Sequence, residues 1–305
     1  MKLYLAPINK LCNHAFRNLC LENGANYVFT EMVKADELIE NDKVQLRRIA
    51  ISKENEPKTI VQIICENLET LEPAIKKIIN LHPNPKEINY NMGCPHSSLV
   101  KNYSGAGILK NFDKIKQVAT ILIKSCENTS IRPSIKTRLG IERGDRLCFE
   151  VFRLLENLGI TKIYIHGRYL SDNYAKPATH EEIGELIQTF PNLEIIANGD
   201  IIDKYSFEKL KIMKPAGFLI GRAALENPEI FSKIEDFEIN KQGYELKDRI
   251  SLIKRFLELR EKCEIDFSQI KCNLAYLTKG VQNCGELRAK INNCKNLGEI
   301  KQHFQ

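Results

Sequence analysis

The sequence of 305 residues contains no tryptophan and no long apolar run. A helix needs about 20 consecutive apolar residues to span a bilayer, so we expect no transmembrane segment and no membrane partner. The first residues, Met1 to Pro7, also lack the long apolar region of a signal peptide. These absences favour a cytoplasmic protein, whereas the missing tryptophan carries no information about function.

The chain has ten cysteines, but they do not have the sequence spacing of metal ligands. The cysteines form no C-x-x-C pair, and those between Cys263 and Cys294 are too far apart for an iron–sulfur motif. We therefore predict no metal site and expect most cysteines to be small buried hydrophobic residues. Cys94 differs because Gly93 and Pro95 place it at the end of a predicted strand. Its spacing alone leaves open a structural cysteine beside a turn or a reactive one.

Strand-like runs alternate with helical patterns through most of the chain, and 43% of all residues are hydrophobic. Eight strand–helix units within about 230 residues predict a (β/α)8 TIM barrel, with a doubly wound open sheet as the alternative. We expect residues 33–51 to be helical, and Thr179 and Glu182 to form a capping box. The predicted strands are residues 2–7, 27–29, 59–64, 87–91, 134–139, 162–166, 193–198 and 217–220.

Polar residues recur at the ends of these strands, and this favours the barrel over the open sheet. In a barrel, residues from the ends of all the strands surround one opening. In an open sheet, such residues would instead be confined to the one switch point at which the strand order reverses. The ring consists of Gln62, Asn91, Lys136, His166, Asn198 and Arg222.

The last part of the chain has no strand pattern. We predict helices over Leu246–Cys263 and Phe267–Thr278, and a linker over residues 231–242. The chain would then divide into a catalytic barrel, residues 1–235, and a small all-α domain, residues 243–305. The net charge of +6 and the many basic residues of this tail are compatible with a polyanionic partner or with an ordinary solvated helical face.

The polar strand ends fit a flavin mononucleotide (FMN) lying over the barrel mouth. Gly221-Arg222 opens a helix, and backbone N–H groups, a helix dipole and an arginine together make a phosphate site. Lys136 can place positive charge beside a ring that gains negative charge on reduction. Gln62 and Asn91 can bond the edges of a planar heterocycle. Each of these residues taken singly is also compatible with a structural role.

Several short blocks, in chain order, resemble the tRNA-dihydrouridine synthase family. Residues 91–95 (N-M-G-C-P) are similar to its N-x-G-C-P signature, and residues 8–12 (I-N-K-L-C) depart from its usual M-x-G-x-T. The other matching blocks are Leu5-Ala6-Pro7 with Phe16-Arg17, residues 136–140 (K-T-R-L-G), 166–168 (H-G-R) with Tyr174 and 177–178, 198–201 (N-G-D-I) and 221–224 (G-R-A-A).

The resemblance implies a monomeric flavin-binding barrel followed by a helical RNA-binding domain, which reduces uridines of tRNA to 5,6-dihydrouridine. It implies a hydride from reduced FMN to C6, a proton from Cys94 to C5, and NADPH or NADH as the reductant. The implied substrate contacts are Asn91, Arg138 and Arg168. The implied FMN contacts are Pro7, Ile8, Asn9, Gln62, Lys136, His166, Asn198, Gly199, Asp200, Gly221 and Arg222.

The chemistry is consistent with a cysteine acid. An ordinary thiol, with a pKa of about 8.5, is largely protonated at neutral pH and can donate a proton directly. A flavin-dependent barrel dehydrogenase acting on a small molecule, similar to dihydroorotate dehydrogenases, would share the phosphate site without needing a basic tail. A non-catalytic RNA-binding protein would explain the charge but not Cys94. Because every FMN candidate precedes Phe231, we expect the barrel to hold its cofactor without the tail.

Overall fold

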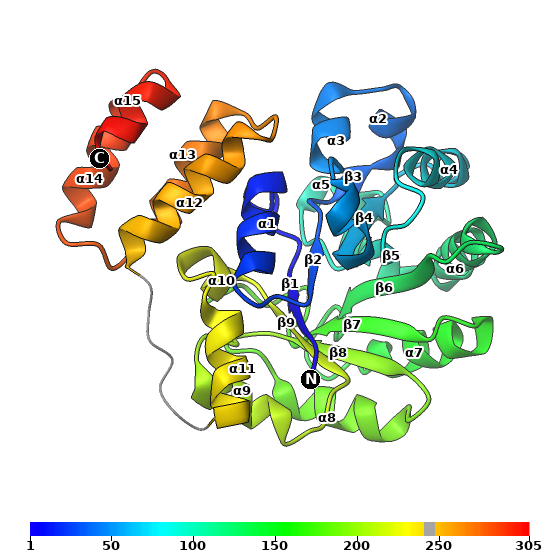
Figure 1. Ribbon diagram of the computed structural model, residues 1–305. Coiled ribbons are helices and arrows are strands. Elements are labelled where there is room, and N and C mark those ends of the chain that lie inside the picture. The colour runs from blue at the N-terminus through cyan, green and yellow to red at the C-terminus, as the bar shows by residue number, and fades with distance from the viewer. Residues whose placement is uncertain (241–247, 305) are drawn as a thin grey trace.

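Eight parallel strands form a closed barrel in the computed structural model, which describes residues 1–240 and 248–304 (Figure 1). The pairing of β2 with β4 and of β9 with β1 closes the sheet. The predicted (β/α)8 barrel is therefore confirmed and the open sheet is excluded. The barrel strands are β1 (Leu3–Leu5), β2 (Tyr27–Phe29), β4 (Thr59–Ile64), β5 (Glu87–Met92), β6 (Arg132–Arg138), β7 (Lys162–His166), β8 (Glu194–Asn198) and β9 (Gly217–Ile220).

The segment predicted as one helical stretch, residues 33–51, is more varied. It begins with a short extra strand, β3 (Val33–Lys34), which pairs with β4 next to the barrel. Two short helices follow, α2 (Ala35–Ile39) and α3 (Lys43–Arg48). The sequence does not indicate this strand because two residues show no periodicity. Strand β3 is extended only because β4 offers it a partner.

Helices cover the outside of the barrel. Asn13 and Asn111 cap α1 and α6 by accepting the backbone N–H groups of Phe16 and Lys114. The predicted capping box at Thr179 is wrong, because its side chain makes no cap hydrogen bond. The main outer helices are α1 (His14–Glu22), α4 (Leu71–Leu81), α6 (Phe112–Cys126), α7 (Leu147–Leu158), α8 (His180–Thr189), α9 (Lys204–Lys211) and α10 (Arg222–Glu226). The shorter ones are α5 (Ser97–Lys101), η1 (Lys53–Lys58), η2 (Leu68–Thr70) and η3 (Gly105–Lys110).

The predicted linker is wrong for most of its length, because residues 230–240 form a helix. The rest of the linker and the start of the helix predicted from Leu246 lie outside the described residues. The part of the chain that the structure describes contains no helix long and apolar enough to cross a bilayer. The helices after the barrel are α11 (Ile230–Asn240), α12 (Arg249–Glu261), α13 (Phe267–Leu277), α14 (Cys284–Asn293) and α15 (Leu297–Gln302).

The tail packs directly on the barrel (Figure 1). Helix α12 contacts α1, and α13 contacts α10. Phe16 of α1 and Phe256 of α12 are fully buried and belong to one apolar cluster that runs through both parts. Six of the ten cysteines are buried, as predicted for small hydrophobic residues. Burial of this interface makes the tail part of the folded core.

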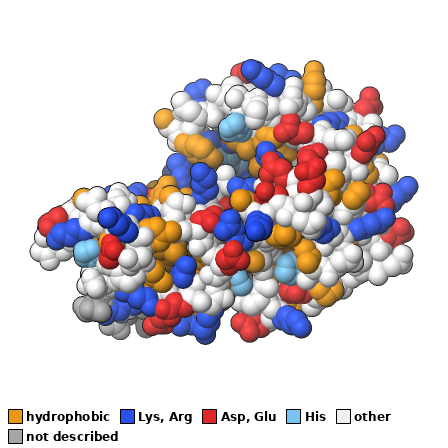
Figure 2. Space-filling view, turned by 90° about the horizontal axis from the view of Figure 1, so that it is seen from above, with side chains coloured by type: hydrophobic (Ala, Val, Ile, Leu, Met, Phe, Trp, Pro, Cys, Tyr) orange, Lys and Arg blue, Asp and Glu red, His pale blue; other side chains and the backbone are white. Residues whose placement is uncertain are grey.

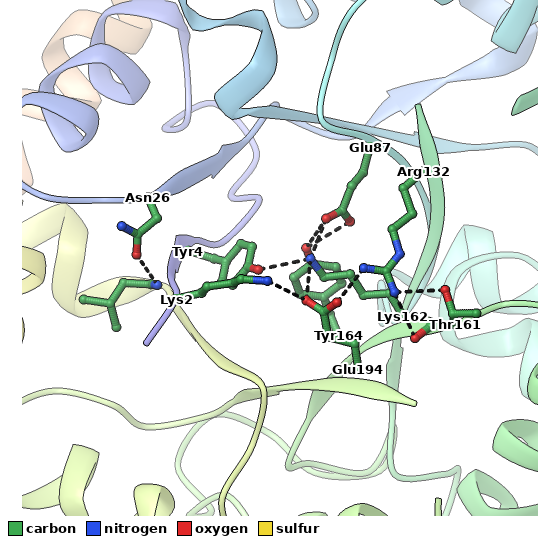
Figure 3. A network of polar contacts seen from close by, with 10 residues as sticks. Lys2, Tyr4, Asn26, Glu87, Arg132, Thr161, Lys162, Tyr164 and Glu194 are labelled. Carbon is green, nitrogen blue, oxygen red and sulfur yellow. Dashed lines mark hydrogen bonds and ion pairs between the residues drawn. The ribbon is translucent and has the colours of Figure 1, made fainter. Parts of the chain in front are cut away.

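A polar network fills the amino end of the barrel (Figure 3). The carboxylate of Glu87 is fully buried and accepts hydrogen bonds from Lys162 at 2.6 Å and from the Tyr164 hydroxyl at 3.0 Å. Glu194 lies 3.2 Å from Lys162 and also pairs with Arg132. Four of these residues are the first of their strands, so the network closes this end of the barrel.

Candidate active site

The carboxyl ends of the strands surround a cavity of about 400 Å³. This volume lies in the range of small-molecule sites. Every residue that the sequence and its resemblance assigned to the site lines this one cavity. They are Pro7, Ile8, Asn9, Gln62, Asn91, Cys94, Lys136, Arg138, His166, Arg168, Asn198, Gly199, Asp200, Gly221 and Arg222.

The loop that carries Cys94 is held from both sides. The side-chain oxygen of Asn91 accepts the backbone N–H groups of Gly93 and Cys94 at 3.0 and 2.9 Å. Arg138 Nε donates to the carbonyl oxygen of Gly93 at 2.7 Å. The thiol itself is partly exposed. Strand β5 thus places an accessible thiol on a fixed turn.

A glycine further along the chain is also required by this turn. Gly105 has a φ of +53°, and a Cβ there would lie 2.5 Å from the carbonyl oxygen of Cys94. The same carbonyl accepts the N–H group of Ala106 at 2.9 Å. Any side chain at Gly105 would therefore displace Cys94.

Amide side chains are linked beneath the cavity. Asn91 Nδ2 donates to Gln62 Oε1, and Gln62 Nε2 donates to Asn89 Oδ1, each at 2.8 Å. Asn89 Nδ2 continues the chain to Ser134 Oγ at 2.9 Å. The two predicted heterocycle contacts, Gln62 and Asn91, line the cavity but already use both ends of their amides. They hold each other in place whatever else they bind.

Lys136 on β6 is a cation without a counter-ion. No carboxylate of the described chain lies within ion-pair distance of its ammonium group. Burial and, to a smaller extent, the neighbouring Arg138 together lower the pKa of Lys136 to about 7. An ammonium group in this position favours an anionic ligand, which would restore its ordinary pKa.

His166 on β7 is neutral. Burial lowers the pKa of its imidazole well below the usual value, and Lys136, Arg138, Arg168 and Arg222 add to this effect. Arg168 Nη1 lies 3.2 Å from His166 Nε2. A guanidinium can only donate, so Nε2 accepts and the ring proton is on Nδ1.

Asp200 is the single carboxylate that lines the cavity among the described residues. Arg168 Nη2 donates to its two oxygens at 2.8 and 2.7 Å, and Arg222 Nη2 donates to one at 2.9 Å. Burial would raise the pKa of Asp200, but hydrogen bonds from Arg168 and from the N–H of Ala178 lower it below the usual value. One negative charge therefore faces several positive ones.

The lining residues that were not assigned from the sequence include Met32, Tyr174 and Tyr276. Tyr174 belongs to one of the recognised blocks, and its ring centroid lies 4.7 Å from the guanidinium carbon of Arg222. Tyr276 lies on α13 in the tail. No sequence signal marks it, because an aromatic residue at helical spacing is normally a core residue.

The molecule has a hollow on the face seen from above, with Lys and Arg side chains at its margin (Figure 2). On the tail, basic side chains alternate with acidic ones in the same view. Several of the tail's cations are ion-paired, including Lys290 with Glu286 and Lys301 with Glu261. The cavity also carries more cations than carboxylates, so both regions have an excess of positive charge.

A closed parallel barrel with a ligand-sized cavity at the carboxyl ends of its strands places this chain among the TIM-barrel proteins. Among solved structures it is similar to DHODH from Eimeria tenella, crystallised in complex with ferulenol. The TM-score is 0.58 and the sequence identity 11%, over 79% of this chain and 81% of that one. This likeness shows the shared fold.

The dihydrouridine synthase (Dus) family model matches residues 4–305, and the chain belongs to this family. It is 27% identical over 314 residues to the probable tRNA-dihydrouridine synthase of Aquifex aeolicus, covering 100% of this chain and 95% of that one. It is 31% identical over 240 residues to tRNA-dihydrouridine synthase B of Pseudomonas putida, covering 77% and 68%. The resemblance seen in the sequence blocks is confirmed.

Proposed function

We propose that this chain reduces uridines of tRNA to 5,6-dihydrouridine, with FMN in the barrel cavity and NADPH or NADH as the reductant. Family membership and the names of its relatives support the reaction. The observation that carries the proposal is the accessible Cys94 thiol on a fixed turn, in the same cavity as a surplus of cations. We also propose that the protein is cytoplasmic and acts as a monomer.

The donor set of the cavity fits FMN. Arg222 begins α10 immediately after β9, where its guanidinium and the free backbone N–H groups can hold a phosphate. Lys136, Arg138 and Arg168 provide further positive charge, and Asp200 is the one carboxylate among the described lining residues that opposes it. When bound and reduced, FMN supplies the hydride for C6 of the uracil.

Cys94 is the proposed acid, which delivers a proton from its Sγ to C5. The hydrogen bonds from the backbone N–H groups of Gly93 and Cys94 to Asn91 hold the turn that carries the thiol, so little backbone reorganisation is needed at the moment of transfer. We propose that Asn91, Arg138 and Arg168 bind the uridine. Arg138 also holds the turn through Gly93, so it couples uridine binding to the position of the acid.

The tail is the proposed contact surface for tRNA, in a two-domain arrangement of residues 1–235 and 243–305. Neutralising phosphates with Lys and Arg releases counter-ions, so affinity for tRNA should fall as the salt concentration rises. The target uridine must leave its stack to reach the cavity, which requires a few kcal/mol, roughly, of binding energy.

The test compares the parent with Cys94→Ala, using tRNA that lacks dihydrouridine. We expect dihydrouridine formation, measured by nucleoside mass spectrometry, to fall about 10²-fold or more while FMN binding is retained. Cys272→Ala is the matched control, because Cys272 is exposed on α13 and outside the cavity. Parental rates in the Cys94 variant would contradict the assigned role. A flavin-bound parent that oxidises NADPH but never modifies tRNA would favour a small-molecule dehydrogenase instead.

A further inference from the structure

The cavity has one wall that the barrel does not provide. Tyr276 of α13 lines it together with Leu11 and Leu225, and all three belong to or pack against the same apolar cluster. Among the described residues after the barrel, Tyr276 is the one that reaches the cavity. Helix α13 packs against α10, and Lys279 pairs with Glu226, so this wall is anchored close to the proposed phosphate site.

A strained loop forms the neighbouring part of the same wall. Pro7, Ile8, Asn9 and Leu11 all line the cavity, and Lys10 between them has a φ of +64°. A left-handed conformation costs a residue with a side chain about 1–2 kcal/mol. The loop therefore keeps its shape only where surrounding contacts enforce it.

Two restraints on this loop depend on α13. Asn273 is fully buried, and its Nδ2 donates to the carbonyl oxygen of Leu11 at 2.9 Å while its Oδ1 accepts from Asn13 Nδ2 at 2.6 Å. One turn earlier, Gln269 Nε2 donates to Glu31 at 3.3 Å.

Glu31 is almost completely buried, and its second oxygen accepts the backbone N–H of Lys10, the strained residue. Residues 269, 273 and 276 are spaced by four and three positions, so they share one face of α13. That face touches both the loop and the cavity.

We propose that α13 is part of the cofactor site, with Asn273 and Gln269 as positioning residues for the loop of residues 7–11 and with Tyr276 as a wall of the cavity. The inference rests on the proposed FMN binding. It replaces the expectation that the barrel holds FMN without the tail. Tight FMN binding then requires the tail whether or not RNA is present.

The experiment is an FMN titration of the full-length apoprotein, followed by flavin fluorescence. We expect Asn273→Ala and Tyr276→Ala each to raise the FMN dissociation constant about tenfold, because one leaves the Leu11 carbonyl unpaired and the other opens the cavity wall. Cys272→Ala, the exposed neighbour on the same helix, should bind FMN as the parent does.

Melting temperatures of the same apoproteins separate this role from a merely structural one. A variant that melts at a lower temperature but binds FMN with parental affinity would overturn the inference. If Asn273→Ala does not fold, Tyr276→Ala and Gln269→Ala decide the question, and parental affinity in both overturns it. A parent that fails to bind FMN would contradict the proposed function as well, so the two failures are distinguishable.

Discussion

The two ends of the barrel differ in how their charged residues are balanced. At the amino end, Glu87 and Glu194 face Lys162 and Arg132 in a balanced, closed network (Figure 3). At the carboxyl end, four cations line a cavity that contains one carboxylate, Asp200, among the described residues. One strand carries members of both sets, since Arg132 begins β6 and Lys136 and Arg138 lie near its end.

This difference separates the charged residues that stabilise the fold from those that can bind a ligand. Buried ions that are paired with one another have no affinity left for a ligand, and removing one partner exposes the desolvation penalty of the other. Cations that lack a counter-ion destabilise the free protein, and a bound anion would relieve that cost. The amino end therefore closes the fold, whereas the carboxyl end is prepared for an anionic ligand.

The largest effect is expected at the closed end. Glu87→Gln removes a negative charge next to the buried ammonium of Lys162. Breaking such a pair typically costs about 3–5 kcal/mol of unfolding free energy. Urea unfolding of the apoprotein measures this loss. Folded Glu87→Gln protein should still bind FMN with parental affinity, because the substitution lies at the opposite end from the cavity.

The exposed pair of Glu72 and Lys76 supplies the control, because Glu72→Ala removes a carboxylate that is open to solvent. Its unfolding curve should match that of the parent. An equally small change for Glu87→Gln would mean that the amino-end network contributes nothing to stability.

The next effect concerns the open end. Arg222→Ala should weaken FMN binding about tenfold, because a hydrogen bond between charged groups typically contributes about 1.5–3 kcal/mol. Riboflavin, which lacks the phosphate, should bind the parent less well than FMN does, and equally well to parent and variant. Arg143→Ala is the matched control, since Arg143 pairs with Asp172 outside the cavity. Equal affinities of the parent for FMN and riboflavin would rule out Arg222 as the phosphate contact.

The smallest effect is a pH dependence of stability. The pKa of Lys136 is about 7 in the folded protein, whereas an ordinary lysine has a pKa of about 10.4. Between these values the unfolded chain binds more protons at Lys136, so its contribution to stability rises as the pH increases above 7. We expect the free energy of unfolding of the parent to rise by roughly 0.5 kcal/mol per pH unit relative to that of Lys136→Met. This is less than the maximum of about 1.4 kcal/mol per pH unit for one titrating group, because solvent screening reduces the effect.

Urea unfolding at pH 6.5, 7.5 and 8.5 measures this difference between the two apoproteins. Saturating FMN should shrink the pH dependence if its negative charge offsets the Lys136 ammonium. Parallel stability curves for parent and variant would show that Lys136 keeps an ordinary pKa.

The sequence determined the barrel and most of the site. Strands β4, β7 and β9 begin and end where they were predicted, because their apolar and β-branched runs are bounded by glycine or by polar residues. The site residues could be predicted because blocks at strand ends must meet at one mouth once the barrel closes. Both signals are local, so each can be seen without knowing the fold.

Tertiary structure alone decided the features that depend on distant partners. Residues 33–34 are extended because β4 lies beside them, and Asn273 restrains Leu11 across a separation of 262 residues. The lowered pKa of Lys136 follows from its burial next to Arg138, and Tyr276 reaches the cavity because α13 packs on α10. No local pattern encodes such contacts, because the energies that create them arise only when the chain has folded.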